Sequence, residues 1–90
     1  MSDADRRELP GLDTFPGLVL TLTALSGELP AALVSRLPAS DSYKEYAVKQ
    51  LKRDNFLRTF YRNSVRGLRL TAAAKHLLLE CWPDQFLPYL

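Results

Sequence analysis

The sequence predicts a mainly α-helical domain that carries one small β-hairpin. Three observations support this fold class: a length of 90 residues, apolar residues at helical spacing along most of the chain, and a change to alternation after Leu57. Ninety residues form one core, because chains divide into several domains only at a few hundred residues. A hydrophobic share of 47% and a charged share of 24% are typical of globular proteins and exclude a disordered chain.

Residues 1–13 are predicted to form a flexible tail outside this domain. Six of them are charged, a composition that favours a mobile segment over part of a core. Early charges also argue against a secretory signal peptide, which needs an apolar segment. The longest uncharged run covers the fourteen residues 14–27, fewer than the roughly 20 that a membrane span needs. The single cysteine, Cys81, excludes an internal disulfide. We therefore expect a cytoplasmic protein with no membrane association.

Two helices are predicted between residues 14 and 38. The first begins at Thr14, a good N-cap residue, and ends at Gly27. Three β-branched residues in this segment would suit a strand equally well, namely Val19, Thr21 and Thr23. The second helix begins near Pro30, which suits a first helical position, and ends before Pro38.

A third helix is predicted from the cap at Ser40 to about Asp54. Positions 100° apart give this helix an apolar face, formed by Tyr43, Ala47, Val48 and Leu51. The opposite face is polar and carries Ser42, Glu45, Tyr46, Lys49, Lys52 and Arg53. Asn55 tolerates the left-handed conformation that often follows a helix.

The hairpin is predicted from a change of period. Residues 57–62 alternate as a strand does and are expected to pair with residues 68–70 across a loop formed by residues 63–67. That loop offers Asn63 and Gly67, residues that accept the positive φ of a hairpin turn.

The chain then forms a last helix over residues 72–82, capped by Thr71, and an apolar extension over residues 83–90. We expect Cys81 to be a small core residue. The predicted core also contains large apolar residues from every element, namely Leu22, Leu25, Leu33, Leu37, Val48, Leu51, Leu57, Leu70, Leu77 and Leu78.

The charges are concentrated in one part of the chain. Residues 41–75 hold nine basic and three acidic residues, a net charge of +6, whereas residues 1–40 and residues 76–90 each carry −2. A polarised molecule of this kind is a candidate to bind a phosphate backbone. An interaction module that binds only protein has no need of this cluster.

Three helices, a two-stranded ribbon and a final helix follow the order of a winged helix-turn-helix, whose second motif helix enters the major groove of DNA. Five residues of the polar face of the third helix could contact bases or phosphates: Ser42, Tyr46, Lys49, Lys52 and Arg53. The alternative for these residues is an ordinary solvated helix face. In the hairpin, or wing, the candidates are Arg58, Arg62, Arg66 and Arg69. Arg66, beside Gly67 at the expected turn, is the leading candidate for a groove contact. The alternative for the wing is a basic sheet edge that opposes aggregation.

The residues from Val48 to Lys75 resemble a known family pattern. The matching segments are VKQLKRDNFL from Val48, Tyr61 with Arg62, and GLRLTAAAK from Gly67. They resemble bacterial winged helix-turn-helix regulators of the multiple-antibiotic-resistance and phenolic-acid-decarboxylase classes, and replication-relaxation-type proteins of mobile elements. The resemblance covers about residues 15–82 within a domain of residues 14–82. It implies double-stranded DNA binding and control of transcription, replication or transfer.

Enzymatic and metal chemistry find no support in the sequence. The four glycines are scattered, so no phosphate-binding loop is present, and no nucleophile elbow occurs. The single histidine, His76, lies about 140° around a helix from Cys81, so the two do not converge on a metal. We expect no enzyme, no catalytic residue, no metal and no cofactor. The alternative function is a protein interaction module, with a homodimer or a C-terminal domain held through Trp82, Phe86, Tyr89 and Leu90.

Overall fold

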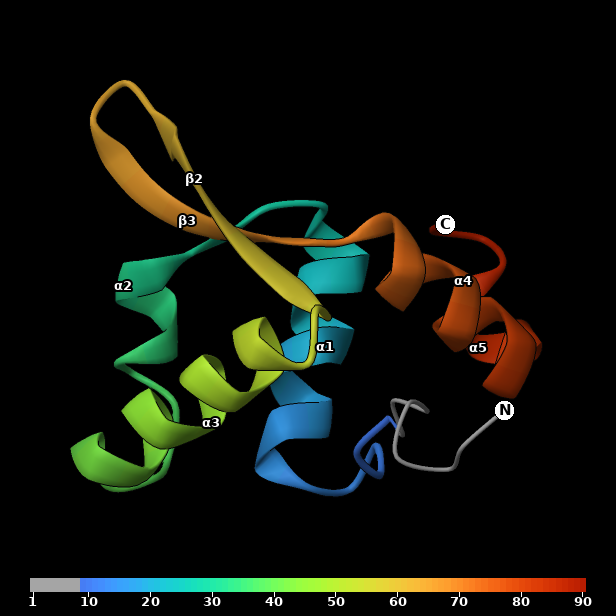
Figure 1. Cartoon of the computed structure of the whole chain (residues 1–90), viewed down its shortest axis with the longest axis horizontal. Coiled ribbons are helices and arrows are strands. Elements are labelled where there is room, and N and C mark those ends of the chain that lie inside the picture. The colour runs from blue at the N-terminus through green and yellow to red at the C-terminus, as the bar shows by residue number, and fades with distance from the viewer. Residues whose placement is uncertain (1–8) are drawn as a thin grey trace.

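The computed structural model describes residues 9–90, and residues 1–8 of the predicted tail lie outside this part (Figure 1). The elements in this range are α1 (Phe15–Ser26), β1 (Leu29–Pro30), α2 (Ala31–Val34), α3 (Asp41–Arg53), β2 (Leu57–Arg62), β3 (Val65–Leu70), α4 (Ala72–Cys81) and α5 (Pro83–Phe86). The three strands form one antiparallel sheet in the order β1-β3-β2. The predicted class, mainly helical with a β-hairpin, is confirmed.

Side-chain caps start three of the helices where the sequence predicted them. The hydroxyl of Thr14 accepts a hydrogen bond from the Gly17 amide at 3.2 Å, and Ser40 accepts one from the Tyr43 amide at 3.2 Å. Thr71 accepts a hydrogen bond from the Ala74 amide at 3.0 Å. Such caps satisfy amide groups that have no partner inside the helix. The first segment is therefore a helix, and its β-branched residues do not make it a strand.

The sheet is larger than the sequence predicted. Leu29 and Pro30 form the short strand β1, which pairs with Leu68 and Gly67 of β3, whereas the sequence predicts the start of a helix near Pro30. β3 also begins three residues before its predicted start at residue 68. The hairpin turn is therefore only two residues long and consists of Asn63 and Ser64, with φ of 52° and 67°.

Gly67 lies in β3 and not in the turn, contrary to the prediction. A Cβ at Gly67 would come within 2.7 Å of the Phe60 ring and 3.3 Å of the Leu29 carbonyl oxygen. Phe60 is the residue paired with Gly67 across the hairpin. Glycine is needed here because an aromatic ring lies over the backbone, and not because of a turn.

The core lies between α1, the sheet and the C-terminal helices. Its buried members include four predicted residues: Leu51, Leu57, Leu70 and Leu78. Four more predicted residues pack against it partly buried: Leu22, Leu37, Val48 and Leu77. Leu25 and Leu33 were predicted wrongly, because they are 46% and 45% exposed. α1 is apolar on every side, so spacing alone does not select its buried face, which carries Val19, Leu20, Thr23 and Ala24.

Two further predictions about buried residues are wrong. Tyr43 is 45% exposed, with its ring beside that of Phe15 at a centroid distance of 5.6 Å, and Lys44 occupies the buried position next to it. Cys81 is exposed at the end of α4 and is not a core residue.

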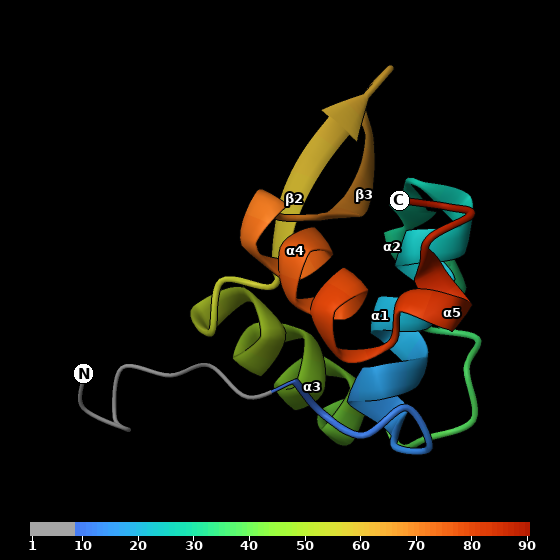
Figure 2. The ribbon, with the colours of Figure 1, turned by 90° about the vertical axis from the view of Figure 1, so that its right-hand side faces the viewer.

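The two ends of the described chain join the core. Phe86 of α5 is 1% exposed, and Trp82 and Leu90 pack against the same cluster. Figure 2 shows α4 and α5 together covering this end of the molecule. Leu9 and Leu12, which belong to the predicted tail, also pack partly buried against the core.

Candidate nucleic-acid interface

α3 presents one straight line of exposed polar side chains. Ser42, Tyr46, Lys49 and Arg53 follow one another at intervals of four, three and four residues, and all four are exposed. This spacing keeps them on one side of the helix over its whole length. The amide of Gln50 donates a hydrogen bond to the Tyr46 hydroxyl at 3.3 Å. We call these four residues the α3 stripe.

A buried lysine holds α3 against the segment that follows α2. The Lys44 ammonium group donates hydrogen bonds to the carbonyl oxygens of Ser35 and, at 3.4 Å, Leu37, and forms an ion pair with Asp41 at 3.3 Å. A cation stabilises the carbonyl groups at the end of a helix. Lys44 is only 7% exposed. It is therefore a structural residue and contributes no exposed charge to the basic surface.

The four arginines of the wing lie on two different faces of the hairpin. The register pairs Arg58 with Arg69 and Arg62 with Val65, so these three arginines share one face. Arg66 pairs with Tyr61 and lies on the other face. The prediction that Arg66 occupies the turn is wrong, because the turn is formed by residues 63 and 64.

We call the face that carries Arg58, Arg62 and Arg69 the outer face of the wing. Two of these three arginines already have partners within the protein. Arg62 forms an ion pair with Glu28, although its side chain remains 67% exposed. The guanidinium carbon of Arg69 lies 5.5 Å from the centre of the Phe60 ring, a cation–π arrangement that fixes its direction. Arg58 is exposed directly across from Arg69.

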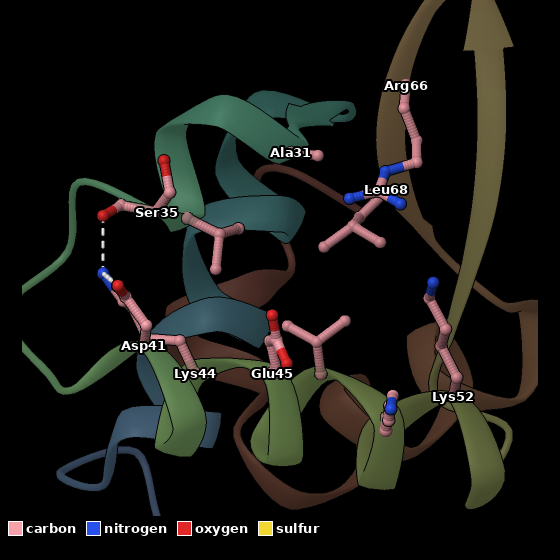
Figure 3. A pocket seen from close by; sticks show the side chains of 11 residues that line it. Ala31, Ser35, Asp41, Lys44, Glu45, Lys52, Arg66 and Leu68 are labelled. Carbon is pink, nitrogen blue, oxygen red and sulfur yellow. Dashed lines mark hydrogen bonds and ion pairs between the residues drawn. The ribbon is translucent and has the colours of Figure 1, made fainter.

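An open hollow of about 570 Å³ lies between α2, α3 and β3. Figure 3 shows Lys52 of α3 and Arg66 of β3 pointing into the same end of it, and Asp41 and Lys44 at the opposite end. Glu45 and Lys49 line its α3 wall between these ends. Partial burial, and to a smaller extent the positive charge of Arg66, lower the pKa of Lys52 below its ordinary value.

Tyr61 of the wing is a further candidate for the interface and was not among the residues selected from the sequence. It is 70% exposed and shares the face of Arg66. The alternation in residues 57–62 already placed Tyr61 on the face of Leu57, but only the two-residue turn reveals that Arg66 lies opposite. Aromatic side chains with a hydroxyl group suit contacts with nucleic acid, because they combine stacking with hydrogen bonding.

Within residues 9–90, no group of three metal-ligating side chains is close enough to hold an ion. In the same part of the chain, no helix is both long and apolar enough to cross a bilayer.

The order of the elements defines a winged helix: α2 and α3 form the helix pair and β2 and β3 form the wing. The fold is similar to that of HlyU from Vibrio cholerae N16961, with a TM-score of 0.55 and 24% sequence identity over 80% of this chain and 84% of that chain. No protein-family model and no curated protein sequence matches this chain. The resemblance to the antibiotic-resistance, phenolic-acid and replication classes stays a prediction.

Proposed function

We propose that this protein binds duplex DNA, with α3 in the major groove and the wing against the neighbouring backbone or minor groove. The observation that carries the proposal is the arrangement of positive charge. The helix α3 and the wing lie in the same half of the molecule, whereas α4 and α5 lie at the other end (Figure 1). Residues 41–75 carry +6; eight of their nine cations lie on α3 and the wing and one, Lys75, lies on α4, and most of them are exposed.

The α3 stripe has the chemistry needed to read a sequence. Ser42, near the start of the helix, and Tyr46 offer hydroxyl groups that donate or accept hydrogen bonds at base edges. Lys49 and Arg53 can donate to the acceptor edge of guanine or to phosphates. An α-helix fits the major groove, which is about 12 Å wide.

The wing supplies contacts that do not depend on sequence. Its tip is the uncharged two-residue turn of Asn63 and Ser64, which we assign to the minor groove, and its outer face carries Arg58 and Arg69 for the flanking backbone. Arg62 contributes less than these two, because Glu28 neutralises part of its charge.

Selection from randomised duplexes tests this division of labour. Tyr46→Ala and Lys49→Ala in the α3 stripe should change the preferred sequence, because they remove contacts to bases. Arg58→Ala combined with Arg69→Ala should weaken binding to every duplex by a similar factor and leave the preferred sequence unchanged. Identical selected sequences from the parent and from both α3 variants would contradict the placement of α3 in the major groove.

We further propose a role in the control of transcription, with replication or transfer of a mobile element as the alternative that the sequence resemblance implies. Selected sites that lie at promoters support the first role, and sites at replication or transfer origins support the second. The two outcomes are read from the same selection experiment.

An apolar groove between α1 and α2 favours a second function, the binding of a protein. The groove is lined by Leu22, Leu25, Ser26, Leu29, Leu33, Arg36 and Leu37, and two of its leucines are almost half exposed. The C-terminal residues that the sequence suggested for a partner leave less exposed apolar surface than expected. Phe86 is buried in the protein's own core, and Trp82 and Leu90 pack against that core. Sedimentation of the parent and of Leu25→Ser with Leu33→Ser tests self-association through this groove.

A further inference from the structure

The wing and α3 face each other across the hollow with two cations. Lys52 comes from the last turn of α3 and Arg66 from the second position of β3, close to the hairpin turn, and their side chains point into the same end of the hollow (Figure 3). Within residues 9–90 neither side chain forms an ion pair. Two like charges held at one place repel each other, and an anion between them removes this repulsion.

The carboxylates that line the hollow do not provide that anion. Asp41 pairs with Lys44 at the opposite end of the hollow. Glu45 precedes Lys52 by seven residues, which corresponds to about 10 Å along the helix axis. Lys49, on the same wall, adds a third positive charge. The end of the hollow next to the wing is therefore positive, and the lowered pKa of Lys52 reflects partial burial and the nearby arginine.

The two cations are fixed by rigid elements. In β3, Arg66 pairs with Tyr61 of β2, and the next two residues, Gly67 and Leu68, pair with β1 as well, so Arg66 follows directly from the part of β3 that is held on both sides. Lys52 follows Leu51, which is 3% exposed and anchors this end of α3 in the core. The guanidinium fork of an arginine can hold two oxygens of one phosphate, and a lysine ammonium group adds a point charge beside it.

Duplex DNA brings a phosphate to this place if the proposed function holds. The major and minor grooves are separated by one sugar–phosphate strand, so a protein with a helix in one groove and a wing against the other straddles that strand. We propose that Lys52 and Arg66 form a clamp for one phosphodiester of the strand that separates the two grooves. This assignment rests on the proposed DNA binding and names the part of the ligand that the hollow takes.

The clamp makes two predictions of opposite sign. In the free protein, Lys52→Gln and Arg66→Gln should each raise the Tm, because each removes the repulsion, and the double variant should gain less than the sum of the two. In duplex binding, each single variant should lose about tenfold in affinity, the size of a lost charge-assisted contact. Lys75→Gln is the matched control, because it removes an exposed charge from α4 at the far end of the molecule.

Inorganic phosphate provides a test that does not depend on DNA. At equal ionic strength, replacing chloride by phosphate should raise the Tm of the parent and of Lys75→Gln by more than it raises the Tm of the Lys52→Gln, Arg66→Gln double variant, whose smaller rise measures the general effect of phosphate on folded proteins.

Each result decides between the clamp and the proposed function. If the parent binds duplex, but the two single variants bind as well as Lys75→Gln, the clamp is wrong and DNA binding stands. If the parent binds no duplex, the proposed function and the phosphodiester assignment both fail, even if phosphate stabilises the parent. Stabilisation by phosphate with unchanged duplex binding would assign the hollow to a free anion and overturn its role on DNA.

Discussion

Replacing Lys44 by methionine removes a buried ammonium group and keeps most of the side chain's apolar length. Lys44 is 7% exposed and donates to the carbonyl oxygens of Ser35 and Leu37, so the substitution leaves both acceptors without their charged donor. Hydrogen bonds from charged donors contribute about 1.5–3 kcal/mol each to stability. Water can enter the open hollow beside Lys44 and replace part of this loss, so we expect Lys44→Met to cost about 1–2 kcal/mol in total.

The loss is measurable by thermal and urea unfolding. For a domain of this size, 1 kcal/mol corresponds to about 4–8 °C in Tm, so the expected fall is roughly 4–16 °C. The fluorescence of Trp82, the single tryptophan, reports unfolding because this residue packs against the core. Lys49→Met makes the same chemical change at an exposed position and should shift the Tm very little. Equal stability of Lys44→Met and Lys49→Met would refute the assignment of Lys44 as the link between α3 and the end of α2.

Three further predictions concern packing and charge. Gly67→Ala should lower the free energy of unfolding by about 1–3 kcal/mol, because the new methyl group overpacks against the Phe60 ring. Adding Phe60→Leu should recover part of this loss, and urea unfolding of the single and double variants measures both effects. Phe86→Ala should lower the free energy of unfolding by about 3–5 kcal/mol, because Phe86 is buried. Leu87→Ala changes a residue that is 68% exposed and should leave the free energy of unfolding within about 0.5 kcal/mol of the parent value. Nearly equal losses for the two variants would contradict the docking of α5. Lys52→Gln should be more stable than the parent at pH 7, because the charged lysine is disfavoured in the fold. This gain in unfolding free energy should shrink as the pH rises from the lowered pKa of Lys52 towards 10.5, because the folded parent loses the disfavoured proton in this range. Above 10.5 the unfolded chain has lost the proton as well. A gain that does not depend on pH would contradict this cause.

The features that the sequence predicted correctly are those set by near neighbours along the chain. Thr14, Ser40 and Thr71 cap helices through amide groups three residues away, so a short segment contains the whole signal. Asn55 takes a φ of 65° directly after α3, as its type and position indicated. The six residues predicted for the polar face of α3 are all exposed, because they follow the helical period; on the apolar face the period placed Ala47 and Leu51 correctly but not Tyr43.

The features that the sequence did not predict depend on contacts between distant segments. β1 has only two residues, too few to show the alternation of apolar and polar residues that predicts a strand. It is a strand only because β3 lies beside it. Gly67 suggested a turn, but its surroundings are set by Phe60 and Leu29, seven and 38 residues away in the chain.

The candidate site shows the same limit. Its residue types were predicted, but their grouping depends on the hairpin register. A turn formed by residues 63 and 64 sends Arg66 to the opposite face from Arg58 and Arg69. Lys44 looked like one more basic residue, and only its hydrogen bonds to the carbonyl oxygens of Ser35 and Leu37 make it structural.

The salt dependence of duplex binding tests the central proposal most directly. The measurement is the affinity of the parent and of the Lys52→Gln, Arg66→Gln double variant for one duplex over a range of salt concentrations. If the protein neutralises phosphates, the logarithm of the binding constant falls linearly with the logarithm of salt concentration, by about 0.9 for each phosphate contact. We expect a steep slope for the parent and a slope smaller by about one contact for the double variant. Duplex binding that is absent at low salt, or that does not change with salt, would contradict the account.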